Sequence, residues 1–339
     1  MKITKDFKCD LAERNQIQRP FVMLKPQTVL FLGISSLSLT PWMSSPLALA
    51  LGMGVALTIQ NPFPQTSHQL ARQLLQLCVI LLGFSMDLEV VLQAGQKGAV
   101  FAIFGITLTL LLGRWLGKRL KIPANTSALI SVGTAICGGS AIAAIASVIG
   151  AAEQEISIAI GTIFLLNAIA LYIFPTLGHF LHLSPEQFGT WAGVAIHDIS
   201  SVVGAASDFE LSALEVATSV KLFRVLWIVP VAFLIAYLSQ KRQATGQHDA
   251  QAKPIKIPWF VGWFLLASIL RSVFPSVAVW SPTIKQFSKA GFRLTLFLIG
   301  TGLSIKALKR VGWQAIAQGV VLWVVTAVCS LGFILWTIP

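Results

Sequence analysis

The sequence is organised around a run of small residues at positions 133–144, which reads Gly-Thr-Ala-Ile-Cys-Gly-Gly-Ser-Ala-Ile-Ala-Ala. Cys137, Gly138, Gly139 and Ser140 stand at its centre, with aliphatic residues on both sides. The pattern predicts two short half-helices that meet at an unwound tip, because glycine accepts irregular backbone. The N-terminus of a half-helix presents free N–H groups and a partial positive charge, which suits an anion. The alternative is a face of small residues for close helix packing.

The rest of the chain has the composition of a membrane protein. Of its 339 residues, 55% are hydrophobic and 11% are charged, and the mean hydropathy is +0.77. This composition excludes two soluble domains, which the length alone would permit. The net charge of +12 does not indicate nucleic-acid binding, because the basic residues lie in short clusters between apolar runs. We therefore expect an all-α, polytopic membrane protein with lipid as its environment.

Apolar stretches close to the ~20 residues that a helix needs to cross the hydrocarbon core predict about nine to eleven membrane segments. They lie near 28–43, 46–60, 69–88, 98–116, 126–150, 156–182, 187–207, 213–239, 258–275, 286–305 and 312–337. The predicted organisation is a cytoplasmic tail at 1–27, membrane helices at 28–239, a cytoplasmic linker at 240–257 and further membrane helices at 258–339.

The basic clusters predict the orientation. They comprise Arg114, Lys118, Arg119 and Lys121, then Lys241, Arg242, Lys253 and Lys256, and finally Lys306, Lys309 and Arg310. Placing all three with the N-terminus in the cytoplasm satisfies the positive-inside rule, and the connection at 87–98 then lies on the opposite side. We expect a multi-pass protein of a bacterial-type inner membrane.

Two pairs of segments resemble one another. Residues 82–88 match 299–305 at an offset of 217, and residues 133–140 match 193–200 at an offset of 60. If the Gly-rich segments at 126–150 and 187–207 both cross the membrane, one pair is inverted and the other parallel, which no single two-fold axis allows. If both are re-entrant hairpins, both pairs are inverted, as in many transporters. We therefore favour two inverted repeats with two broken or re-entrant Gly-rich helices.

At this point the residues resemble a known family. The run at 132–144 resembles the hallmark of the YeiH-like proteins, which are labelled sulfate exporters, and Asn61-Pro62 followed by residues 81–88 is a supporting match. The resemblance covers the chain from about residue 28 to the C-terminus. The family is similar to the wider set of cation/proton antiporters and bile-acid-symporter-like carriers. The resemblance implies inverted repeats and broken helices at a midplane site, and it assigns no catalytic residue.

Ionisable residues inside the predicted membrane segments are functional candidates, since burying a charge in lipid is costly. Lys221 and Arg224 are three residues apart and share a helix face, while His197 and Asp198 occupy the tip of the second Gly-rich segment. One hypothesis is that the two cations face the half-helix ends and make an oxyanion site, with His197 and Asp198 coupling a proton. The alternative is a structural ion pair between Asp198 and Lys221 or Arg224.

The predicted substrate site gathers residues from several segments. Asn167 lies in the middle of the span at 156–182, where it either binds substrate or holds a neighbouring helix. The complete predicted set is Cys137, Gly138, Gly139, Ser140, Asn167, Ser200, Lys221 and Arg224.

These observations predict a secondary carrier of a small anion, such as sulfate, a related oxyanion or an organic acid, driven by a proton or ion gradient. An anion channel is the alternative, because helix-end dipoles also build filters. A primary pump is not indicated, because the chain has no G-x-x-x-x-G-K-[ST] loop. No H-E-x-x-H or G-x-S-x-G motif indicates an enzyme.

The remaining sequence features predict few partners. Cys9, Cys78, Cys137 and Cys329 show no C-x-x-C or Cys/His spacing, so we expect no metal, no other cofactor and no disulfide framework. The expected partners are the small anion, the coupling proton or ion, and the lipid bilayer. Small residues on the segment at 46–60 also permit a homodimer.

Overall fold

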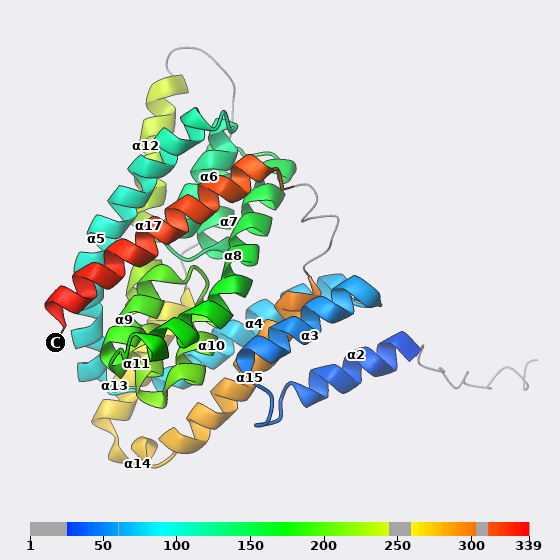
Figure 1. The fold of residues 1–339 in the computed structure, drawn as a ribbon. Helices are drawn as coiled ribbons and strands as arrows, with labels where there is room; N and C mark the ends of the chain where they lie inside the picture. The colour runs from blue at the N-terminus through cyan, green and yellow to red at the C-terminus, as the bar shows by residue number, and fades with distance from the viewer. Residues whose placement is uncertain (1–25, 60, 244–258, 303–310, 339) are drawn as a thin grey trace, which may run out of the picture.

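The computed structural model describes residues 26–59, 61–243, 259–302 and 311–338, and within these ranges every regular element is a helix (Figure 1). The all-α prediction is therefore confirmed. The helices are α2 (Pro26–Leu37), α3 (Ser45–Thr58), α4 (Pro64–Gly83), α5 (Leu88–Arg119), α6 (Ala124–Ala135), α7 (Gly139–Ile149), α8 (Glu153–Phe180), α9 (Pro185–Ala195), α10 (Ile199–Phe209), α11 (Leu211–Leu226), α12 (Ile228–Gln243), α13 (Trp259–Val273), α14 (Pro275–Ala278), α15 (Ser281–Thr301) and α17 (Trp313–Thr337).

Local sequence signals set where several of these helices begin. Proline occupies the first turn of α3, α4, α9 and α15, where its missing N–H costs no hydrogen bond. Ser184 caps α9 by accepting a hydrogen bond from the Gln187 N–H, and the Gln187 side chain accepts one from the Ser184 N–H. This reciprocal capping box ends the connection after α8 and starts α9 at one defined residue.

Three helices of the described residues are long and apolar enough to cross a membrane: Glu153–Phe180, Leu211–Tyr237 and Trp313–Thr337. The bent pair Pro64–Gly83 and Leu88–Gln96 makes a fourth candidate if its two parts form one span. Shorter apolar helices cover Gln27–Leu37, Ser45–Thr58, Gly139–Ile149 and Trp259–Val273. A polytopic helical membrane protein is thus supported, and the larger number of nine to eleven segments stays a prediction.

The connection predicted at 87–98 is wrong. α5 begins at Leu88, and the chain turns by 111° between α4 and the start of α5. Asp87 stands at the N-cap, where its carboxylate pairs with Arg271 and accepts a hydrogen bond from Ser272 Oγ at 2.9 Å. The same Ser272 hydroxyl accepts the Leu88 N–H. The end of α13 therefore anchors the start of α5, and this contact is not visible in hydropathy.

The first Gly-rich segment is a hairpin. At the start of α6, Asn125 Nδ2 donates to Glu155 Oε2 in the first turn of α8 at 3.1 Å. At the end of α6, a Cβ built on Gly133 would lie 3.1 Å from Ile163 Cγ1, further along α8. α6 and α8 therefore run parallel. α7 connects the end of α6 to the start of α8, so it must run back beside them.

The second Gly-rich segment is also a hairpin. A Cβ on Gly189 of α9 would meet Val216 Cβ of α11 at 2.8 Å, and one on Gly193 would meet Val220 Cβ at 3.0 Å. A step of four residues forward along α9 thus corresponds to a step of four residues forward along α11, so the two helices run parallel. α10 joins the end of α9 to the start of α11 and therefore runs back.

The two hairpins point toward one another. The first hairpin ends just before α8 begins, and the second starts just after α8 ends, so their open ends lie at opposite ends of α8. Figure 1 shows α6 and α7 beside the upper part of α8, and α9 and α10 beside its lower part. This arrangement agrees with the re-entrant alternative favoured by the sequence, in which the chain returns to the side from which it entered.

Two contacts join positions that the predicted repeats treat as equivalent. Thr109 Oγ1 of α5 lies 3.3 Å from Thr326 Oγ1 of α17, and these hydroxyls are 217 residues apart in sequence. A Cβ on Gly138 would lie 3.7 Å from the backbone nitrogen of Asp198, 60 residues later. A pseudo-two-fold axis brings equivalent residues together in this way. The complete repeat stays a prediction, since residues 303–310 lie outside the described ranges; so do most of the predicted tail at 1–27 and linker at 240–257.

A charged seam joins α15 to α10 and α11. Lys285, Lys289 and Arg293 follow one another at intervals of four along α15 and so share one face. Lys285 pairs with Glu215 of α11. Lys289 and Arg293 lie within electrostatic reach of Asp208, which stands in the last turn of α10, just beyond the predicted segment at 187–207.

We expect Asp208 to make stability depend on pH. Burial raises its pKa to about 6, although the Ser45 N–H, Lys289 and Arg293 act in the opposite direction. The folded protein then holds this proton to higher pH than the unfolded chain, whose aspartates titrate near 3.9. The contribution is therefore fully present below about pH 4 and is lost as pH rises through about 6. Asp208→Asn should raise the melting temperature at pH 8 and leave it unchanged at pH 4; a difference independent of pH would contradict this assignment.

Candidate functional site at the hairpin tips

The unwound tips of the two hairpins lie against one another. Gly138, between α6 and α7, has φ 65° and ψ −127°, a conformation that residues with a side chain rarely adopt. A Cβ at this position would lie 3.6 Å from the carbonyl carbon of His197 and 3.3 Å from Ile163 Cγ2. Glycine is needed here for the backbone conformation, and a Cβ would also press on Ile163 of α8.

Two cations from α11 bind the C-terminal ends of the half-helices. Lys221 Nζ donates to the carbonyl oxygen of Ile196, which caps α9, at 2.6 Å. Arg224 Nε donates to the carbonyl oxygen of Ala135, the last residue of α6, at 2.6 Å. The exposed fractions of Lys221 and Arg224 are 0% and 1%. Each cation therefore opposes the partial negative charge of a helix C-terminus.

The two N-terminal ends at the tips differ. Asp198 caps α10: its Oδ2 accepts the Ser200 N–H at 3.0 Å and a short hydrogen bond from Ser200 Oγ. No side chain caps α7, which begins at Gly139. Gly139 is half-buried and Ser140 is exposed. Among the described side chains, none of opposite charge caps the positive end of α7, unlike the other three helix ends at the tips.

Several buried polar atoms at the tips have no hydrogen-bond partner. They include both Nη groups of Arg224, both ring nitrogens of His197, Nδ2 of Asn167 and Oγ1 of Thr134. Buried polar groups are normally paired, so a cluster of unpaired ones is unusual and indicates a site that another molecule completes. The Arg224 and Asn167 groups are donors only, which suits an acceptor such as an anion.

Asn167, in the middle of α8, holds the tip of the second hairpin. Its Oδ1 accepts the backbone N–H groups of His197 at 3.1 Å and Asp198 at 3.3 Å. Holding a neighbouring helix was one of the two roles expected of this residue. Its unpaired Nδ2 leaves the second role, contact with substrate, open.

Replacing Asn167 should separate these two roles. Asn167→Ala leaves two buried N–H groups without an acceptor, and each such loss costs about 1–3 kcal/mol. We expect a clearly lower melting temperature. Asn167→Asp keeps the acceptor oxygen and should restore most of the stability. If Asn167→Ala melts like the wild type, the amide does not hold the tip.

The structure shows which half-helix ends the cations face. Lys221 and Arg224 were expected to face these ends, and both donate to carbonyl oxygens at the C-terminal, negative ends, where the dipole attracts them. Their role in binding an anion stays a prediction. The alternative, a structural ion pair, is not formed within the described residues: Asp198 caps α10 and makes no salt bridge with Lys221 or Arg224, although its charge acts on Lys221. The shared helix face of Lys221 and Arg224 is confirmed, since both reach the hairpin tips from α11.

The other predicted residues also gather at this place. Cys137 is buried beside Gly138, and the Ser200 hydroxyl is already engaged by Asp198. Sequence reasoning missed Thr134 and Gly105. A Cβ on Gly105 of α5 would lie 3.4 Å from both Nη groups of Arg224, so this glycine borders the free side of the guanidinium. Thr134 stands within the small-residue run, but Gly105 carried no signal in the sequence.

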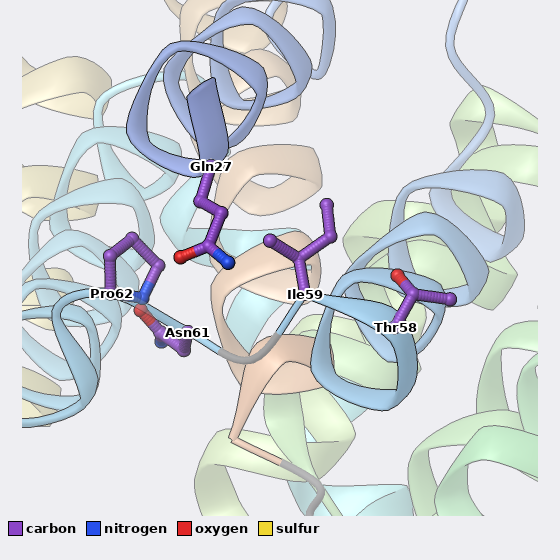
Figure 2. Close-up of a pocket in the computed structure, with 5 residues that line it drawn as sticks. All are labelled: Gln27, Thr58, Ile59, Asn61 and Pro62. Carbon is purple, nitrogen blue, oxygen red and sulfur yellow. The ribbon is translucent and has the colours of Figure 1, made fainter. Parts of the chain in front are cut away.

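A separate pocket of about 490 Å³ lies away from the tips. It is lined by Gln27, Thr58, Ile59, Asn61 and Pro62, and Figure 2 shows Gln27 extending from α2 toward the connection between α3 and α4. The Asn61 amide is engaged locally, donating to Thr301 Oγ1 and accepting the Phe63 N–H. None of the residues predicted to bind substrate lines this pocket, so we do not place the anion there.

Comparison with known proteins gives the family. The model of the family described as conserved hypothetical protein 698 matches residues 28–319. The chain belongs to this family. It is the YeiH-like family that residues 132–144 resemble.

The curated relatives of this family are similar over most of their length. A UPF0324 membrane protein of Bdellovibrio bacteriovorus is 46% identical over 87% of this chain and 90% of the relative. One of Bacteroides thetaiotaomicron is 44% identical over 86% and 87%, and one of Shewanella oneidensis is 38% identical over 93% and 98%. Their shared name supports a membrane protein and states no activity. No solved structure matches the chain.

Proposed function

We propose that this protein is a secondary carrier that binds a small anion, such as sulfate, a related oxyanion or an organic acid, at the hairpin tips. One observation carries the proposal. Three of the four helix ends that meet at the tips are opposed by a side-chain charge, whereas no described side chain opposes the N-terminus of α7. An anion bound at this end would oppose its partial positive charge, as anions do at other helix N-termini.

Arg224 supports the same proposal. Its Nε is used by the carbonyl oxygen of Ala135, at the tip of the first hairpin, while both Nη groups are free. The guanidinium fork fits the oxygens of a carboxylate or a tetrahedral oxyanion, so one side chain can both stabilise the tip and bind the anion.

The arrangement of the hairpins supports alternating access. They extend from opposite ends of α8 and meet beside Asn167. A ligand at the tips would therefore lie between the two membrane sides from which the hairpins enter. Broken helices at the membrane midplane are a recurring way to build such a site. We propose the inner membrane as the location, with the N-terminus in the cytoplasm, and His197 and Asp198 as the proton-coupling groups.

Binding is the first test. The detergent-purified protein should melt at higher temperature with sulfate, phosphate, acetate or another small anion, because a ligand of the folded state adds about 2.7 kcal/mol at a hundredfold excess over Kd. Cations and zwitterions of similar size serve as controls. If no anion shifts a cooperative melt, the proposal fails.

Transport in liposomes then separates a carrier from a channel. A carrier should show saturable uptake of labelled anion that accelerates when the same anion is present on the opposite side. A current that grows with voltage and never saturates would instead identify an anion channel, and the carrier proposal would be wrong.

A further inference from the structure

The hairpin tips bury more positive than negative side-chain charge. Lys221 and Arg224 are the only lysine and arginine among the fully buried described residues, and that set contains no aspartate or glutamate. Asp198 is the nearest carboxylate, half-buried at the edge of the tips. The four helix ends contribute two positive and two negative half-charges, which cancel. With His197 neutral, the tips therefore carry one unbalanced positive charge.

The elements packed around the tips add no further charge among the described side chains. α17 contains no charged residue, and the carboxylates of α8, Glu153 and Glu155, lie in its first turn. On α5, which borders Arg224 at Gly105, the described charges lie toward the two ends of the helix: Glu89 in the first turn, and Arg114, Lys118 and Arg119 in the last two turns. The cations of α15 lie at the open end of the second hairpin, where Lys285 pairs with Glu215, and Lys289 and Arg293 lie within electrostatic reach of Asp208. Cys137 counts as an uncharged thiol at neutral pH.

His197 is a neutral group at the tips that one proton converts into a cation. The residue is 1% exposed and neither ring nitrogen has a partner, while its backbone N–H is held by Asn167. A protonated imidazole offers two donors to an anion, and a bound divalent anion favours that protonated form.

We infer that the tips bind an anion of one net negative charge, and that a divalent oxyanion binds only together with a proton on His197. The inference rests on the proposed anion site and specifies the charge of its substrate. It follows from the cost of leaving a charge unbalanced in a buried site. A singly charged anion neutralises the tips when His197 is neutral. A doubly charged anion needs one more positive charge, which a proton on His197 supplies.

Sulfate and methanesulfonate form a matched pair of probes. Both are tetrahedral sulfur oxyanions, and between pH 5 and pH 8 the first carries two charges and the second one. Thermal shifts, or titration calorimetry on the detergent-purified protein, give the affinity for each at several pH values. Each shift is compared with the ligand-free protein at the same pH.

Methanesulfonate should bind equally well from pH 5 to pH 8. At pH 8, sulfate should bind at least about tenfold more weakly than methanesulfonate. Its affinity should then rise by up to about tenfold for each unit of decreasing pH, because one proton is taken up with each sulfate. His197→Gln should make sulfate binding weak at every pH, whereas Arg114→Gln, at an exposed position on α5, should leave the binding of both anions as in the wild type. Because the His197 ring makes no hydrogen bond, we expect His197→Gln to fold.

Two results would overturn the inference. One is sulfate that binds as tightly as methanesulfonate at pH 8; the other is sulfate binding that keeps its pH dependence in His197→Gln. Failure of both anions to bind a cooperatively melting protein would instead refute the anion site itself. The outcomes therefore distinguish an error in the charge balance from an error in the proposed function.

Discussion

Arg224→Gln should lose anion binding while the protein remains folded. The substitution removes the two free Nη donors and one buried charge at the tips. Truncating one partner of a buried, hydrogen-bonded charge pair costs about 2–5 kcal/mol, so we expect the affinity for anions to fall by roughly 30-fold or more. The hydrogen bond to Ala135 is also lost, but a cation buried without a counter-ion is itself unfavourable, and the two effects offset one another in the ligand-free protein.

The measurement is a pair of thermal shifts, with and without anion, on the variant and the wild type. Arg114→Gln is the matched control, because Arg114 is an exposed arginine on α5 and the same chemical change there should leave binding intact. If Arg224→Gln binds anions as the wild type does, the guanidinium only stabilises the end of α6. The proposed site would then have to move away from α11.

Gly138→Ala should damage both folding and transport. The backbone at Gly138 has a positive φ that costs other residues of order 1–3 kcal/mol, and the added Cβ would lie 3.3 Å from Ile163 Cγ2. The strain therefore lies in the backbone at the tip and in the contact with Ile163, because the backbone of His197, at 3.6 Å, is at ordinary contact distance. We expect a lower melting temperature in detergent and loss of anion exchange in liposomes.

Gly262→Ala is the control for this variant. Gly262 lies on α13 with nothing within 4 Å of a built Cβ, so the same substitution should change neither property appreciably. Normal melting and exchange in Gly138→Ala would show that the tip does not need the positive-φ backbone that the structure gives Gly138. A stable but inactive variant would show instead that this backbone serves transport more than folding.

The sequence predicted the hairpins from two features. The small residues at 133–144 indicated a break in a helix, and their weak match to residues around 193–200 indicated a second one. The parity of the predicted crossings then favoured re-entrant hairpins. Contacts such as Asn125 with Glu155 agree with that choice, because they make α6 parallel to α8.

Other features could not be predicted because they depend on contacts between distant residues. The start of α5 at Leu88 depends on Asp87 pairing with Arg271, which lies 184 residues later. Hydropathy falls in this stretch, so the sequence indicated a connection where the chain is helical. The polarity was identified correctly, but a polar helix start and a polar loop have the same composition.

The amino-acid sequence alone establishes a helical membrane protein, a broken helix at Gly138 and two buried cations on one helix face. Each of these follows from local composition and spacing. Tertiary packing determines which atoms the cations meet: Lys221 reaches a carbonyl 25 residues earlier, and Arg224 reaches one 89 residues earlier. The C-terminal ends of α6 and α9 are thereby neutralised and the N-terminus of α7 is left free. That difference depends on how the two hairpins pack against α11. Helix periodicity determines the face on which a side chain lies, but it does not determine which other helix packs against that face.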